Sequence, residues 1–97
     1  MTVTAGNIIV GTTSGKLIKV DSNGNLVWNK DVTRLININY GLDINSISVM
    51  NDGNIIVGTT SGKLIKVDSN GNLVWNKDVT RLININYGLD INNISSN

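Results

Sequence analysis

The sequence contains no cysteine, histidine, glutamate or proline. Without cysteine the chain cannot form a disulfide, and without cysteine or histidine it lacks the ligands of an ordinary structural zinc site. The missing histidine also removes the usual general base of a serine triad. Two common ways of stabilising a small domain are therefore excluded, and oligomerisation remains.

Charge is scarce and nearly balanced, with eight Lys and Arg against seven Asp. The basic residues recur singly rather than in a block, and nucleic-acid binding needs clustered positive charge, so we expect no nucleic-acid partner. No apolar run approaches the roughly 20 residues that span a membrane, and residues 1–7 lack the features of a signal peptide. We expect no membrane partner and a soluble protein, cytoplasmic as expressed.

What the chain does contain is a long internal repeat. Residues 6–48 recur as residues 53–95 with one difference, Ser46 against Asn93. Repeats of this length are typical of solenoids, propellers and repeat arrays. Because repeats under separate functional selection diverge, the near identity indicates a unit that was designed or was amplified recently.

Turns that contain glycine separate short β-branched runs within each repeat. The first copy predicts strands at 7–13, 16–21 and 25–30, joined by Ser-Gly and Asn-Gly turns in which glycine supplies a positive φ. A long connection, 31–45, leads to a fourth strand at 46–50. Alternation of Ile and Asn in this connection favours extended structure over a short helical turn. The fold class is all-β, with consecutive antiparallel strands.

Both faces of the predicted strands are apolar. Ile8 and Val10 share one face of the first strand, and Ile9 lies on the other. In so short a repeat only another copy of the same unit can cover both faces, which favours a β-propeller over a β-solenoid. Residues 1–52 form the first predicted blade repeat and residues 53–97 the second.

Turn and strand signatures follow one another in a fixed order along the second copy. They are Asp52-Gly53, Gly58, the stretch 61–68 (SGKLIKVD) and the stretch 70–75 (NGNLVW). With these signatures, the stretch 48–79 resembles a blade of the quinoprotein-like (PQQ-like) propellers. The resemblance covers both repeats. It implies two four-stranded antiparallel blades, with Trp75 docked between neighbouring blades.

The resemblance does not extend to the chemistry of quinoprotein enzymes. Those enzymes surround a quinone cofactor and calcium with acidic and amide residues from several different blades. Two near-identical blades without Glu or His cannot supply such a set. We therefore expect no enzymatic activity, no catalytic, cofactor-binding or metal-binding residues, and no cofactor.

Two blades are too few for a closed propeller, which uses about four to eight. We expect a homo-oligomer in which the second blade of one chain packs on the first blade of the next. Four chains with eight blades are favoured over three chains with six, because quinoprotein propellers are eight-bladed. A C-terminal strand at 92–96 is offered to the neighbouring chain. The alternative is that both ends stay unpaired and the sheet faces alone make the contact.

The leading functional hypothesis is a structural, self-assembling propeller module. The alternative is a lectin-like or peptide-binding propeller with one equivalent shallow site per blade. Tyr40 and Tyr87, each followed by glycine, are the candidates for a glycan site, although such a tyrosine more often packs a loop onto a sheet.

Three further patterns have simple structural interpretations. The stretch 21–25 (DSNGN) has the composition of a calcium loop, but its glycine and its twelfth residue, Val32, break the EF-hand pattern, so we interpret it as a hairpin turn. The stretch 11–16 (GTTSGK) lacks the spacing and the helix of a phosphate loop. Arg34 is expected to form an ion pair with Asp31 or Asp43 across the long connection.

Overall fold

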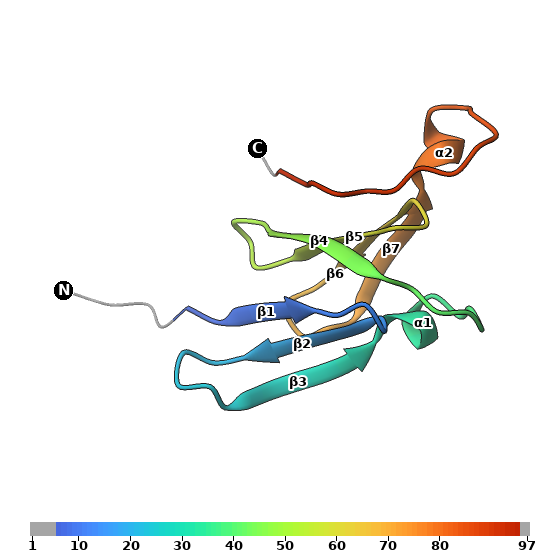
Figure 1. Cartoon of the computed structure of the whole chain (residues 1–97). Helices are drawn as coiled ribbons and strands as arrows, with labels where there is room; N and C mark the ends of the chain where they lie inside the picture. The colour runs from blue at the N-terminus through green and yellow to red at the C-terminus, as the bar shows by residue number, and fades with distance from the viewer. Residues whose placement is uncertain (1–5, 96–97) are drawn as a thin grey trace.

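The computed structural model describes residues 6–95, which form two antiparallel sheets and two single helical turns (Figure 1). The elements in chain order are β1 (Ile8–Gly11), β2 (Lys16–Val20), β3 (Leu26–Asp31), α1 (Val32–Leu35), β4 (Ile44–Val49), β5 (Ile55–Thr59), β6 (Lys63–Val67), β7 (Leu73–Asp78) and α2 (Val79–Leu82). No helix in this part of the chain is long and apolar enough to cross a membrane.

The two sheets have different numbers of strands. The first sheet has the order β1-β2-β3, and the second has the order β4-β5-β6-β7. Strand β4, which follows the connection of the first repeat, pairs with β5 of the second repeat, with Ile47 opposite Val57. Among the described residues the second sheet thus has the four strands predicted for a blade, and the first sheet has three of them.

The predicted strands lie where β1 to β4 are found, with shifted ends. The first was placed at 7–13, but β1 ends at Gly11, because Thr12 and Gly15 belong to the turn that leads to β2. The predicted strand at 46–50 begins earlier, at Ile44. The C-terminal strand predicted at 92–96 is absent from residues 91–95, which have no partner strand among the described residues. Residue 96 lies outside them.

Hairpin turns form as the sequence predicts. Asp21 Oδ1 accepts hydrogen bonds from the backbone N–H groups of Asn23 and Asn25, both at 2.9 Å, while Gly24 adopts a φ of +85°. The carboxylate thus closes the turn on itself, and the glycine takes the left-handed conformation that other residues avoid. The stretch 21–25 is a hairpin turn in the structure.

The connection after β3 begins with a helical turn, so the prediction of extended structure is wrong for α1. Asp31 caps this turn, because its Oδ1 accepts hydrogen bonds from Thr33 N–H at 3.1 Å and Thr33 Oγ1 at 2.6 Å. Asp followed by Thr two residues later was the available signal, since such side-chain caps favour helix starts. Asn37, at φ 58°, then turns the chain out of the helix.

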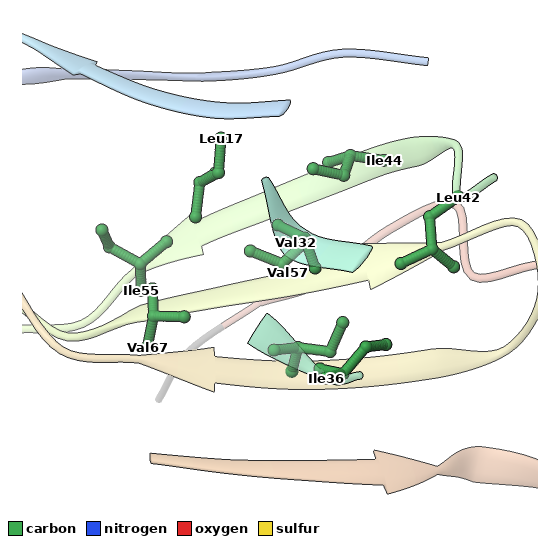
Figure 2. Close-up of a cluster of buried hydrophobic side chains, with 9 residues drawn as sticks. Leu17, Val32, Ile36, Leu42, Ile44, Ile55, Val57 and Val67 are labelled. Carbon is green, nitrogen blue, oxygen red and sulfur yellow. The ribbon is translucent and has the colours of Figure 1, made fainter. Parts of the chain in front are cut away.

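The hydrophobic core lies between the two sheets (Figure 2). The first repeat contributes residues of β2, α1 and the connection, and the second sheet contributes residues of β4, β5 and β6. The buried members are Leu17, Val32, Ile36, Leu42, Ile44, Ile55, Val57, Ile65 and Val67. Full burial of one such side chain is worth about 1.5–3 kcal/mol, so contact between the sheets provides much of the stability of the fold.

Candidate functional site

Each sheet has two apolar faces, which we name after residues that they carry. The tryptophan face consists of Leu17, Trp28, Val32, Ile36 and Leu42 in the first copy and Leu64, Trp75, Val79, Ile83 and Leu89 in the second. The valine face consists of Ile8, Val10, Ile18 and Val20 in the first copy and Ile55, Val57, Ile65 and Val67 in the second. Inside the chain, the tryptophan face of the first copy packs against the valine face of the second.

The other two faces have no second sheet packed over them within the described part of the chain. Val10 is 40% exposed, whereas its counterpart Val57 is fully buried. Ile83 is 56% exposed, whereas its counterpart Ile36 is 9% exposed. Each repeat therefore carries both halves of one interface, the tryptophan face and the valine face. The tryptophan face is covered in the first copy and open in the second, and the valine face is covered in the second copy and open in the first.

The open tryptophan face of the second copy is hollowed. A groove of about 270 Å³ is lined mainly by apolar side chains, among them Ile56, Leu64, Trp75 and Ile94. Lys66 lies at the same groove. The groove leaves apolar side chains open to contact with another protein.

Polar contacts fix how the two covered faces meet. Trp28 Nε1 donates a hydrogen bond of 3.0 Å to the carbonyl oxygen of Ser69, and Lys19 Nζ donates one of 2.9 Å to the same oxygen. Ser69 lies in the turn between β6 and β7. Two donors from one sheet thus hold a turn of the other sheet, which sets the register of the interface.

Gly71 lets this turn approach closely. It adopts a φ of +84°, and a Cβ there would lie 3.0 Å from Lys30 Cε and 3.1 Å from Trp28 Cδ2. The equivalent Gly24 in the first copy has the same conformation, but nothing lies within 4 Å of its Cβ position. The contact that surrounds Gly71 is therefore missing around Gly24.

A comparison of the sequence with known families agrees with this arrangement of sheets. The sequence model of the family described as outer membrane protein assembly factor BamB matches residues 1–89. The chain belongs to this family of PQQ-type propeller repeats. The resemblance drawn from the sequence is thus confirmed, and the two antiparallel sheets are of the kind found in propeller blades. No curated protein matches the chain.

Each of the two propeller repeats also forms one polar pocket beside its helical turn. The first, of about 400 Å³, is lined by Lys16, Lys30, Asp31 and Arg34 among others. The second, of about 390 Å³, is lined by the equivalent residues of the second copy. In the first pocket Lys16 Nζ lies 3.7 Å from Asp31 Oδ2. A polar pocket of nearly equal size thus recurs in both repeats.

Hydrogen bonds hold the carboxylates of these pockets in their ionised form. The Thr33 hydroxyl lowers the pKa of Asp31, and the Thr33 N–H and the charges of Lys16 and Arg34 act in the same direction. The predicted ion pair of Arg34 with Asp31 or Asp43 does not form within 4 Å in the described chain. Lys16 is the partner instead, because the pairing of β2 with β3 places it opposite Asp31.

Both tyrosines are exposed in the single chain. Tyr40 is 51% exposed and Tyr87 is 63% exposed, so neither ring is buried. Neither lines the polar pocket of its repeat. The sequence analysis missed Lys19, Ser69 and Gly71 as interface residues. The available signal was the position of Lys19 opposite Trp28 in the hairpin.

Proposed function

We propose that this chain is a structural module that assembles head-to-tail with copies of itself into a closed β-propeller and has no catalytic role. One observation carries the proposal: each of its two open faces has the same residues as a face that is covered inside the chain. The partner that fits an open face is therefore a second copy of this chain. The near identity of the repeats fits a blade that was designed or amplified recently.

The proposed contact joins the tryptophan face of one chain's second repeat to the valine face of the next chain's first repeat. It would bury Leu64 and Ile83 of one copy against Val10 and Ile18 of the other, as their counterparts are buried within the chain. Trp75 and Lys66 would donate to the carbonyl oxygen of Ser22, as Trp28 and Lys19 do to Ser69. Because the two faces differ, the contact is heterologous and forms a ring if the rotation closes.

The number of blades in the ring is twice the number of chains. Each chain supplies two repeats, so four chains give eight blades and three chains give six. We favour four chains, as the resemblance to eight-bladed quinoprotein propellers implies. The mass of the native assembly distinguishes the two rings.

The positions of the carboxylates support a structural role over a catalytic one. Asp21 and Asp68 close hairpin turns, and Asp31 and Asp78 cap helical turns. Asp52 accepts from the backbone N–H and the side-chain amide of Asn54. Each of these acidic groups is engaged in holding a turn or a helix start.

Two single substitutions test the head-to-tail contact. Ile83→Asp places a charge on the open tryptophan face, and Val10→Asp places one on the open valine face; both sites are exposed in the single chain, so the fold should survive. Each variant alone should be monomeric by light scattering, because one half of its interface is blocked. A mixture of the two variants should form a 1:1 dimer, since one intact junction remains.

The unchanged chain should show one ring of defined mass in native mass spectrometry. A folded monomer at all concentrations up to the millimolar range would refute the proposal. So would a mixture of the two variants that stays monomeric while the unchanged chain forms a ring, because the contact would then not be head-to-tail.

A second candidate is a lectin-like or peptide-binding propeller with one shallow site per blade. The observation that favours it is the polar pocket, which recurs in both repeats with the same residues. Binding of a glycan or an acidic peptide with a stoichiometry of two per chain, abolished by Arg34→Ala together with Arg81→Ala, would support it. Unchanged binding in that double variant would refute it.

A further inference from the structure

The edge of β1 that faces away from β2 pairs with no described strand. In the second sheet the equivalent edge, that of β5, is covered by β4. An open edge presents unpaired backbone N–H and C=O groups and accepts an additional strand readily. Among residues 6–95, the first sheet therefore lacks the strand that completes the second sheet.

In this chain, the strand that completes the second sheet comes from the end of the preceding repeat. Strand β4 follows the connection of the first repeat, begins where Ile44 N–H donates to Thr12 O at 3.1 Å, and then pairs with β5. Its side chains also reach back to the first sheet, since a Cβ on Gly11 would lie 2.8 Å from Ile47 Cδ1. Strand β4 thus contacts the first sheet but is a strand of the second sheet.

The segment after the second connection is held in the same way. Ile91 N–H donates to Thr59 O at 3.0 Å. A Cβ on Gly58 would lie 2.9 Å from Ile94 Cδ1 and 2.5 Å from Ile91 Cγ2, which matches the contact of β4 with Gly11. Figure 1 shows this C-terminal segment, in red, along the second sheet on the side away from the first. The segment occupies the place that is equivalent to that of β4, but it has no strand beside it among the described residues.

We infer that residues 91–95 form the fourth strand of the first sheet of a second copy, where they pair with β1. This inference rests on the proposed head-to-tail assembly and adds exchange of a strand to packing of the faces. The register follows from that of β4 and β5: Ile91 lies opposite Thr12, Ile94 opposite Val10, and Ser95 opposite Ile9. The occupant of the open edge is thus a defined segment of the same sequence, joined by antiparallel pairing.

A disulfide across the predicted pair tests the register directly. Residues directly opposite in an antiparallel pair have Cα atoms about 4.5–5.5 Å apart, within the range that a disulfide spans. The chain has no native cysteine, so the double variant Ile9→Cys with Ser95→Cys should form covalent oligomers under mild oxidation. The matched control is Ser48→Cys with Ile56→Cys, the same pair inside the second sheet, which should form a crosslink within one chain.

Non-reducing electrophoresis and native mass spectrometry give the outcomes. A ladder of covalent oligomers for the first variant and a crosslinked single chain for the control support the inference. If the ring forms and the control crosslinks but the first variant does not, strand exchange is wrong and face-to-face assembly stands. A crosslink between residues 9 and 95 within a single chain also overturns it. An unchanged chain that stays monomeric refutes the assembly itself, and the strand exchange with it.

Removal of residues 91–97 provides a second readout that does not depend on cysteine chemistry. The shortened chain keeps both sheet faces but cannot supply the strand, so its ring should dissociate at a protein concentration at least tenfold higher than that of the full chain. Sedimentation at several concentrations measures this shift. Equal dissociation of the two chains would overturn the inference.

Discussion

The two repeats have almost the same sequence but opposite patterns of burial. Leu17 and Val32 are fully buried in the first repeat, and Val57 and Ile65 are fully buried in the second, while the counterparts of all four are at least partly exposed. Local secondary structure does not differ in the same way, since β2 and β6 pair with the next strand in the same register. The neighbour, and not the sequence of the repeat, decides which face is buried.

This difference shows how the same repeat can stand at either end of the chain. A repeat with two different apolar faces can be covered only by a repeat on each side, so any finite chain leaves one face of each kind open. A polar cap at each end is one solution, as in solenoid proteins. The described repeats carry no such cap, because the open faces keep the same side chains as the covered ones.

The largest expected difference between the repeats concerns Leu17 and Leu64. In the Ile83→Asp background, which we expect to be monomeric, Leu17→Ala should lower the free energy of unfolding by about 2–5 kcal/mol, the usual cost of emptying a buried leucine site. Leu64→Ala should cost less than about 1 kcal/mol there, because Leu64 has no second sheet over it. Urea unfolding measures both values. In the assembling chain the two costs should become similar, and equal costs in the monomer would contradict the comparison.

Much of the fold could be predicted from the sequence because the repeat, the glycine turns and the two-sided apolar strands are local patterns. The assignment to PQQ-type propeller repeats rested on the spacing of Asp52-Gly53, Gly58 and Trp75 and is confirmed. The helical turn α1 was missed because the Ile and Asn alternation after it was given more weight than the cap formed by Asp31 and Thr33.

The interface itself could be predicted only in part. Apolar residues on both faces indicated that another copy of the repeat covers each sheet. Trp75 was predicted to lie between neighbouring blades. The carbonyl of Ser69 as the shared acceptor for Trp28 and Lys19 could not be read from the sequence, because it depends on the angle between the sheets. Backbone acceptors leave no residue-specific signal, since every residue carries one.

Gly71 and Gly24 offer a smaller contrast within the interface. Alanine at either position should cost about 1–2 kcal/mol, because both glycines have a left-handed conformation that Cβ disfavours. In the monomeric background Gly71→Ala should cost roughly 1 kcal/mol more than Gly24→Ala, since its Cβ also meets Trp28 and Lys30. Thermal unfolding of the two variants measures the difference. A Gly24→Ala cost that rises to the Gly71→Ala value in the assembling chain would show that the open turn is covered there.

We expect no difference between the repeats in the stability that their capping aspartates contribute. The hydroxyl of Thr33 lowers the pKa of Asp31, and the hydroxyl of Thr80 lowers that of Asp78, with bonds of 2.6 Å in both copies. A carboxyl group with a lower pKa in the folded chain binds fewer protons there than when unfolded. Its contribution to stability is therefore present above the unfolded pKa of about 3.9 and is lost as the pH falls through the folded pKa.

Asp31→Asn and Asp78→Asn should consequently reduce the loss of stability below about pH 4 to the same extent, in contrast to the unequal effects at the sheet faces. Urea unfolding between pH 2 and pH 7 in the monomeric background measures both slopes. Equal slopes are expected because each capping aspartate has its threonine and its lysine partner in its own repeat. The distance from lysine Nζ to aspartate Oδ2 is 3.7 Å for Lys16 with Asp31 and 3.8 Å for Lys63 with Asp78. Unequal slopes would mean that the neighbouring sheet changes the pKa of a capping aspartate. The neighbour would then determine more than which side chains are buried.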